Sequence, residues 1–181
     1  MAVADLDDDG TPDLAITHNN TNNLSVLLGA GDGGFRAPTT LDVGDGSGSM
    51  TIADLNADGI LDLAAVLFDS DAAVVLLGSG GGSFGPARRV AVGDGPVDLA
   101  LCDLDLDGAP DLATVNLMSD NVSVVRGSPS GPPEAALSFS SGGDAPGDFL
   151  IADLNLDGAP DLVVTNLFTD NVTVLLNQQG P

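Results

Sequence analysis

Oxygen-bearing side chains recur along this chain in a ten-residue pattern whose chemistry suits a hard metal ion. The pattern begins at residues 5, 54, 103 and 153, and its first copy reads D-L-D-D-D-G-T-P-D-L. Each copy has a side-chain oxygen at positions 1, 3, 5 and 9, and glycine at position 6, where the bend needs a positive φ. Crowded carboxylates repel one another, and a divalent cation removes that repulsion. The spacing therefore predicts one metal site in each copy.

Calcium is the metal that this donor set suits best. It takes about six to eight oxygen ligands in flexible geometry, whereas magnesium demands a stricter octahedron and zinc prefers His and Cys. A backbone carbonyl at position 7 would complete each set, and about four Ca²⁺ ions are expected for the four copies. The predicted ligands are Asp5, Asp7, Asp9, Thr11 and Asp13; Asp54, Asn56, Asp58, Ile60 and Asp62; Asp103, Asp105, Asp107, Ala109 and Asp111; and Asp153, Asn155, Asp157, Ala159 and Asp161.

An EF-hand and a plain hairpin turn would also bring Asp and Gly together, but both fit the pattern poorly. An EF-hand needs Glu at position 12 and flanking helices, but position 12 here holds Ile16, Ala65, Thr114 and Val164, all in apolar runs of β type. The EF-hand and the helical dockerin are therefore both excluded. A tight hairpin favours Asp-Gly, but it needs one Asp or Asn and not four oxygen side chains at fixed places.

Short apolar runs around each loop predict β-strands. The run before a loop, such as 50–53, has large apolar residues at its first and third places, which is a period of two. A second run follows each loop, a third begins near residues 23, 73, 121 and 171, and a weaker fourth covers 39–43, 88–92 and 136–139. Four short antiparallel strands in about 49 residues suit one blade of a β-propeller. One blade cannot bury both faces, so neighbouring blades must stack.

The expected fold is an all-β propeller that forms one repeat domain over residues 1–181. Its blades are expected at about 1–48, 49–97, 98–146 and 147–181, the last being incomplete. Four blades leave a ring open at its seam. We therefore expect a piece of a larger ring, or self-association that completes one, since open sheet edges invite pairing.

Composition excludes several classes of protein. The net charge is −23, from 27 acidic residues against four Arg, so binding to nucleic acid or insertion into an anionic membrane is not expected. The acidic residues are 26 Asp and one Glu, and Lys is absent, which argues against helices. No apolar run approaches the roughly 18 residues of a membrane span. No signal peptide is visible, so either the protein is not exported or the chain is a piece of a longer one.

The sequence offers no catalytic system, and we expect a protein that is not an enzyme. His18 stands in a polar stretch, 18–22, and is interpreted as a solvated turn residue. Cys102 aligns with Ala4, Ala53 and Ala152, which indicates a small core residue, and a single Cys excludes an internal disulfide. Ser residues have no paired base, so no nucleophile is activated.

The loop pattern D-x-[DN]-x-D-G-x-x-D before a strand resembles the FG-GAP repeats of integrin α-subunit propellers and the VCBS-type repeats of bacterial surface proteins. The stretches that contain Phe35-Arg-Ala-Pro38 and Phe84-Gly-Pro86 are similar to the Phe-Gly and Pro elements of that family, whereas residues 127–133 lack the Phe. The resemblance implies a calcium-bearing propeller, outside the cell or on its surface, that binds a protein or carbohydrate partner. The alternative is an accessory propeller of a secreted polysaccharide-degrading enzyme.

A partner is expected at the end of the propeller that lies opposite the acidic loops. In a four-stranded meander, successive connections alternate between two ends. That opposite end gathers the turns at 18–22, 68–71, 117–120 and 168–170 and the loops at 44–48, 93–96 and 143–146. Phe68 and Phe168 are its candidate contact residues.

Overall fold

A computed structural model describes residues 1–127 and 135–178, which form antiparallel sheets throughout. Among these residues the sole helical element is η1, a 3-10 turn at Phe68–Ser70. The sheets are arranged as blades. Blade 1 is β1 (Ala2–Ala4), β2 (Asp13–His18), β3 (Asn23–Leu27) and β4 (Thr39–Asp42); blade 2 is β5 (Ser47–Ala53), β6 (Asp62–Leu67), β7 (Ala72–Leu76) and β10 (Arg88–Ala91). Blade 3 is β11 (Pro96–Cys102), β12 (Asp111–Asn116), β13 (Asn121–Val125) and β14 (Leu137–Ser140); blade 4 is β15 (Pro146–Ala152), β16 (Asp161–Asn166) and β17 (Asn171–Leu175).

The predicted all-β propeller architecture is confirmed, including the short fourth strands of blades 1 to 3. The connection between the third and fourth strands of blade 2 adds a hairpin that the sequence did not indicate, formed by β8 (Gly78–Gly80) and β9 (Ser83–Phe84). In blade 1 the same connection keeps only a single bridge, between Gly29 and Phe35. The Phe of the Phe-Gly element therefore pairs with a glycine in both blades.

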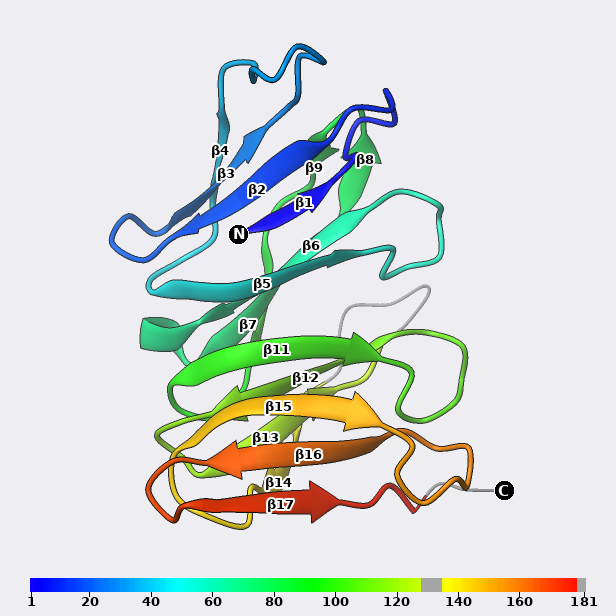
Figure 1. The fold of residues 1–181 in the computed structure, drawn as a ribbon. Coiled ribbons are helices and arrows are strands. Elements are labelled where there is room, and N and C mark those ends of the chain that lie inside the picture. The colour runs from blue at the N-terminus through cyan, green and yellow to red at the C-terminus, as the bar shows by residue number, and fades with distance from the viewer. Residues whose placement is uncertain (128–134, 179–181) are drawn as a thin grey trace.

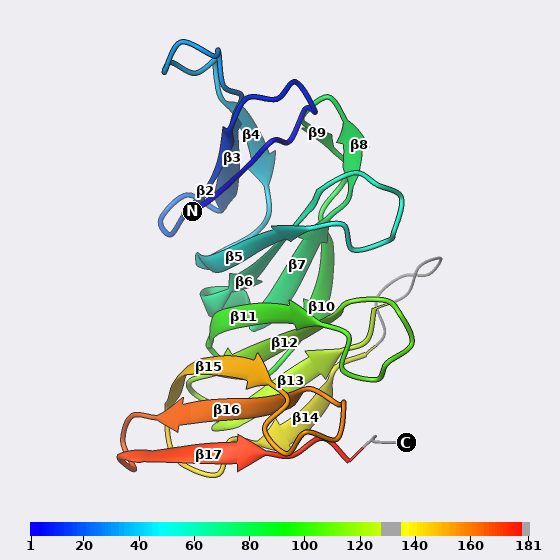
Figure 2. The same ribbon diagram turned by 45° about the vertical axis from the view of Figure 1, so that its right-hand side comes forward.

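The blades stack side by side as an open arc (Figures 1 and 2). The first strand of each blade lies innermost, because β5 contacts β1 and β11, and β11 contacts β15. Blade 1 and blade 4 lie at opposite ends of the stack, so the ring is not closed. The acidic loops follow β1, β5, β11 and β15, one in each blade. All four lie at the same end of the propeller, which is to the right in Figure 1.

The hydrophobic core consists of three clusters, each lying between two adjacent blades. This arrangement follows from the strand pattern, in which alternate apolar residues point to the two faces of each blade. Between blades 1 and 2, Leu24 and Val26 pack with Leu63 and Leu67. Between blades 2 and 3, Val66 packs with Leu99 and Leu112. Between blades 3 and 4, Val115 and Val122 pack with Phe149 and Val164.

Candidate metal centre

The backbone of each acidic loop bends at two places, position 4 and position 6. The glycines at position 6 have φ of +83° to +92°, which confirms the predicted bend, and a Cβ there would meet no atom within 4 Å. Position 4 also has positive φ, between +58° and +62°, although it holds Asp8, Ala57, Leu106 and Leu156. This second bend has no signal in the sequence, because these residue types share no preference for the left-handed region.

The Asp at position 1 organises the turn through the backbone N–H groups of positions 5 and 6. In loop 1 (residues 5–13), Asp9 N–H donates to Asp5 Oδ1 at 3.1 Å and Gly10 N–H donates to Asp5 Oδ2 at 2.7 Å. The same pair recurs in loop 2 (54–62), loop 3 (103–111) and loop 4 (153–161). The Asp at position 5 accepts the N–H of position 7, at 2.8 Å in loop 1. The expectation that the position-7 residues bind calcium through their carbonyls stays a prediction.

The Asp at position 9 is a buried clamp in all four loops. Asp13 is 0% exposed, and its two oxygens accept the N–H groups of Leu6 and Gly29, each at 2.7 Å. The equivalent residues of the other loops are Asp62, Asp111 and Asp161. Each accepts two backbone N–H groups at 2.7 to 3.0 Å, one from position 2 of its loop and one from the residue sixteen places after the Asp. This clamp was missed from the sequence, although the glycine that recurs sixteen residues later at 29, 78 and 127 was a signal for it.

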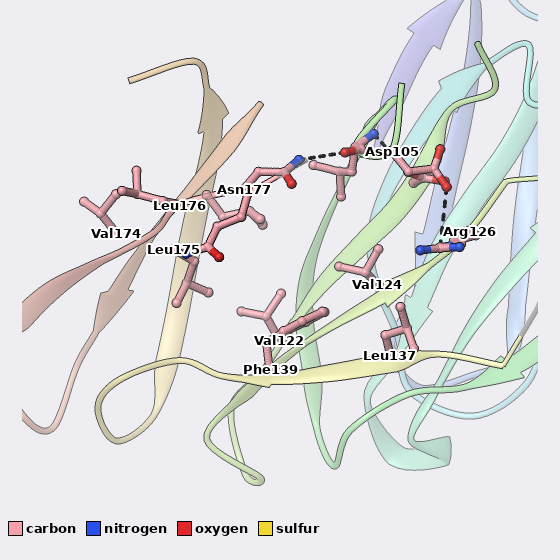
Figure 3. A pocket seen from close by; sticks show the side chains of 14 residues that line it. Asp105, Val122, Val124, Arg126, Leu137, Phe139, Val174, Leu175, Leu176 and Asn177 are labelled. Carbon is pink, nitrogen blue, oxygen red and sulfur yellow. Dashed lines mark hydrogen bonds and ion pairs between the residues drawn. The ribbon is translucent and has the colours of Figure 1, made fainter. Parts of the chain in front are cut away.

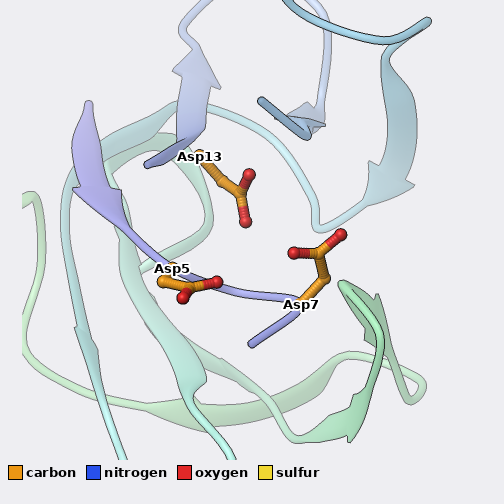
Figure 4. Close-up of side chains that lie close together, drawn as sticks. All are labelled: Asp5, Asp7 and Asp13. Atoms are coloured by element: carbon orange, nitrogen blue, oxygen red, sulfur yellow. The ribbon is translucent and has the colours of Figure 1, made fainter. Parts of the chain in front are cut away.

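Carboxylates of positions 1, 3 and 9 converge in loops 1 and 3. One oxygen from each of Asp5, Asp7 and Asp13 lies within 4.8 Å of the others, as does the set Asp103, Asp105 and Asp111. Figure 4 shows the three side chains of loop 1 facing a common space. The position-5 residues, Asp9 and Asp107, do not belong to either cluster.

Loops 2 and 4 carry Asn at position 3 and gather fewer charges. Asn56 Nδ2 donates to Asp58 Oδ2 at 3.0 Å, and Asn155 Nδ2 donates to Asp157 Oδ2 at 2.8 Å. The amide therefore offers its oxygen to the loop while its nitrogen holds the neighbouring carboxylate.

One carboxylate oxygen in each of loops 1 and 3 is buried without a hydrogen-bond partner. These atoms are Asp7 Oδ1 and Asp105 Oδ1, both at position 3. The Asp7 side chain is 9% exposed. A buried charged oxygen without a partner is costly, and a bound cation would remove the cost. The all-oxygen donor set and these orphaned atoms fit a calcium ion.

The electrostatics of the metal-free loops also favour a cation. Desolvation raises the pKa of Asp7, and the charges of Asp9 and Asp13 raise it further, against the opposing effect of Arg36. Burial likewise raises the pKa of Asp62 and of Asp111, against the backbone N–H groups that they accept. Hydrogen bonds from Thr11 lower the pKa of Asp9. Desolvation is the largest cause of all three raised pKa values, and the charges of neighbouring carboxylates add to it, so a cation bound in the loop would lower them.

The turns and loops of the predicted partner end lie together as expected. In blades 2 to 4 the turn is hydrogen-bonded to the loop that enters the same blade, as in Phe68 N–H to Gly46 O at 2.8 Å and Leu167 N–H to Ala145 O at 2.9 Å. In blade 1 the turn instead accepts hydrogen bonds from the loop that leaves the blade, as in Gly44 N–H to Asn22 O at 3.1 Å. Phe168 and Met118 are 83% and 68% exposed at this end, whereas Phe68 is partly buried.

The structure corrects two expectations about His18. His18 ends β2, is partly buried, and its Nε2 lies 2.9 Å from Ser25 Oγ, so it is not a solvated turn residue. The expectation that no Ser has a paired base is therefore wrong for Ser25. Cys102 packs against the core between blades 3 and 4, as predicted, and burial followed by the charges of Asp103 and Asp111 raises the pKa of its thiol. A high thiol pKa opposes reactivity.

An apolar groove of about 530 Å³ opens between blades 3 and 4 (Figure 3). Val122, Val124 and Phe139 line the side of blade 3, and Leu162 and Leu175 line the side of blade 4. Asp105 and Arg126 stand beside it, joined by an ion pair of 3.4 Å. The described part of blade 4 has three strands, so no fourth strand of that blade lies opposite β14 across the groove.

The repeat geometry agrees with a comparison against known families. A model described as "FG-GAP-like repeat" matches residues 5–65, 54–114 and 103–164. The chain belongs to the FG-GAP-like repeat family. No curated protein matches the chain. Within the described residues no helix has the length and apolar character that a bilayer span requires.

Solved structures share the fold of this FG-GAP-like chain at low sequence identity. An Agrocybe aegerita lectin that recognises non-reducing terminal N-acetylglucosamine has a TM-score of 0.60 and 20% identity, over 98% of this chain and 52% of the lectin. BBS1N in complex with ARL6DN has a TM-score of 0.60 and 13% identity, over 99% of this chain and 57% of its own. The Photorhabdus luminescens Tc holotoxin pore has a TM-score of 0.50 and 17% identity, over 98% of this chain and 9% of its own. The chain thus spans about half the length of the lectin and of BBS1N.

Proposed function

We propose that this FG-GAP propeller is a calcium-binding recognition module, without catalysis of its own, that acts outside the cell or at its surface. The observation that carries the calcium assignment is the pair of orphaned, buried oxygens, Asp7 Oδ1 and Asp105 Oδ1, within converging carboxylates. Calcium would be held by the side-chain oxygens at positions 1, 3, 5 and 9 of each loop and by the carbonyl at position 7. Its chemistry would be neutralisation of charge and fixing of the loop, as in the integrin-like and VCBS-type repeats that the loops resemble.

Calorimetric titration of the chelator-treated chain with Ca²⁺, followed by circular dichroism, tests the metal assignment. We expect about four ions per chain and a higher melting temperature, while Mg²⁺ binds more weakly because it demands a stricter octahedron. A melting temperature that is the same in excess chelator and in millimolar Ca²⁺ would overturn the assignment.

We propose a carbohydrate as the partner, held at the end of the propeller opposite the acidic loops. Support comes from the exposed Phe168 and Met118 at that end and from the lectin that shares the fold. An exposed aromatic ring offers an apolar face to a sugar, and Phe168 is 83% exposed there. A protein ligand, or service as the accessory propeller of a polysaccharide-degrading enzyme, is the alternative use of the same surface.

Binding of oligosaccharides that end in N-acetylglucosamine, measured on a glycan array and by calorimetry, tests this face. Phe68→Ala and Phe168→Ala should weaken binding, with calcium affinity unchanged. Phe139→Ala removes an aromatic ring of 49% exposure from the groove between blades 3 and 4, so it is the matched control. Weaker binding in Phe139→Ala alone would move the partner to that groove and refute the proposed face.

We propose that the open arc is completed by further blades, either of a second copy or of a larger ring. Val172 and Val174 on blade 4 are 62% and 48% exposed, and Met1 and Val3 on blade 1 are 76% and 60% exposed. Light scattering after size exclusion tests the second copy: a dimer in Ca²⁺ supports it, and a monomer at all concentrations contradicts it.

A further inference from the structure

Arginine accompanies the acidic loops in a pattern that follows their charge. Loops 1 and 3 have Asp at position 3, and each is contacted by one guanidinium; loops 2 and 4 have Asn there, and no described guanidinium contacts them. Within residues 1–127 and 135–178, the ion pairs are those of Arg36 with Asp7 and Asp9 and that of Arg126 with Asp105.

The contacts are directed at the ligand set itself. Arg36 Nη1 lies 3.3 Å from Asp7 Oδ2, and Arg36 Nη2 lies 3.3 Å from Asp9 Oδ2. Arg126 Nε lies 3.4 Å from Asp105 Oδ2, as the dashed line in Figure 3 marks. In both loops the arginine takes one oxygen of position 3 and leaves the other, Oδ1, buried and without a partner.

The two arginines come from different places in the blade, so the association does not follow from the repeat. Arg126 follows β13, and the same place after β7 and β17 holds Leu77 and Leu176. Arg36 follows Phe35, and the residue that follows the corresponding Phe84 is Gly85.

We propose that Arg36 and Arg126 are tethered counter-ions that set the calcium affinity of loops 1 and 3. The inference rests on the proposed calcium function and adds a regulation of two of its four sites. Each guanidinium neutralises the additional carboxylate of its loop in the metal-free protein and then repels the incoming ion. A unit charge about 6 Å from a doubly charged ion in water-like surroundings changes its binding constant about tenfold.

Nuclear magnetic resonance can resolve the loops one by one. The N–H of the position-6 glycine is bonded to the position-1 carboxylate in every loop, so the amide signals of Gly10, Gly59, Gly108 and Gly158 report the four sites separately. In a Ca²⁺ titration with sucrose added to keep the metal-free chain folded, Arg36→Gln should move the midpoint of Gly10 to about tenfold lower Ca²⁺ and leave Gly59 and Gly158 in place. Arg126→Gln should do the same for Gly108.

Two controls separate the tethered charge from other effects. Arg88→Gln removes the same charge from β10, where the described residues include no ion pair to an acidic loop, and should shift no midpoint. Arg36→Lys keeps a positive charge beside the loop and should move the Gly10 midpoint by less than about threefold. An unmoved Gly10 midpoint in Arg36→Gln, or an equal shift at all four glycines, overturns the inference while the calcium function stands. If no glycine signal responds to Ca²⁺, the proposed function fails and the inference fails with it.

Discussion

Replacing Asp13 by Asn should destabilise the protein even without metal, because the carboxylate is a structural clamp as well as a predicted ligand. Both Asp13 oxygens accept backbone N–H groups at 2.7 Å, and the side chain is fully buried. An amide keeps one acceptor and turns an NH₂ group toward the second backbone N–H. The loss of a hydrogen bond to a charged acceptor, with a buried donor left unpaired, costs about 2–4 kcal/mol of the free energy of unfolding.

Asp7→Asn is the matched control in the same loop. Asp7 Oδ1 accepts no hydrogen bond, and its Oδ2 faces a guanidinium that is 55% exposed. The ion pair is half exposed on the arginine side and contributes about 0–1 kcal/mol, while Asn also removes a buried charge whose Oδ1 has no partner. Without metal this variant should therefore not lower the free energy of unfolding by more than about 1 kcal/mol. In Ca²⁺ both variants should lose stability further, since each removes an oxygen that is predicted to bind the ion.

Urea unfolding in chelator, with sodium sulfate added to strengthen apolar burial, measures both variants under the same conditions. The two effects then separate: the cost of Asp13→Asn is present with and without calcium, and the cost of Asp7→Asn appears only with calcium. If Asp7→Asn is as destabilising as Asp13→Asn in chelator, position 9 has no special structural role and the clamp is refuted.

Three further changes have defined outcomes. With free Ca²⁺ at about 100 times the dissociation constant, four sites would add about 11 kcal/mol to the free energy of unfolding. Because this is comparable with the whole stability of a domain, excess chelator should leave the chain largely unfolded or loosely packed. The measurement is loss of the cooperative melting transition, and an unchanged melting temperature contradicts the prediction. The pKa values of Asp7, Asp62 and Asp111 are raised, so the folded metal-free chain binds protons more tightly than the unfolded one. In chelator with sodium sulfate added to keep the chain folded, the melting temperature should therefore fall as pH rises above the ordinary value of 3.8, and a rise over that range contradicts this. Gly29→Ala should lower the free energy of unfolding by about 1–3 kcal/mol, because the added Cβ would lie 2.6 Å from the carbonyl oxygen of Pro12. Urea unfolding in Ca²⁺ measures this loss, and an unchanged free energy would show that the loop can move aside.

The fold could be predicted because its signals are local and repeated. Alternation of apolar residues defined the strands, and the acidic loops, which start at residues 5, 54, 103 and 153, set the period. The extra hairpin β8–β9 was not predicted, since its sequence is mostly glycine and has no alternation.

The candidate site was predicted as a set of residues but not as a geometry. In loops 1 and 3 the carboxylates of positions 1, 3 and 9 converge, whereas the position-5 carboxylate, which the spacing placed with them, lies outside both clusters. The clamp by Asp13 depends on Gly29, which lies sixteen residues away on another connection. Arg36 reaches Asp7 across 29 residues, a pairing that no local pattern can show. The site therefore depends on tertiary contacts that begin only when the blade is folded.

The clamp also couples the acidic loops to the packing between blades. The position-9 carboxylate accepts the N–H of the leucine at position 2. In blades 1 to 3 that leucine packs in the hydrophobic cluster between its own blade and the next one. Leu6 is 5% exposed, Leu104 is 7% exposed, and Leu55 packs against the cluster between blades 2 and 3. Leu154 holds the same place in blade 4 and is 47% exposed, because no described blade covers that face. Burial at this position is thus set by the neighbouring blade and not by the residue. An ion bound in a loop would fix the leucine beside it, so metal binding and blade stacking should strengthen each other.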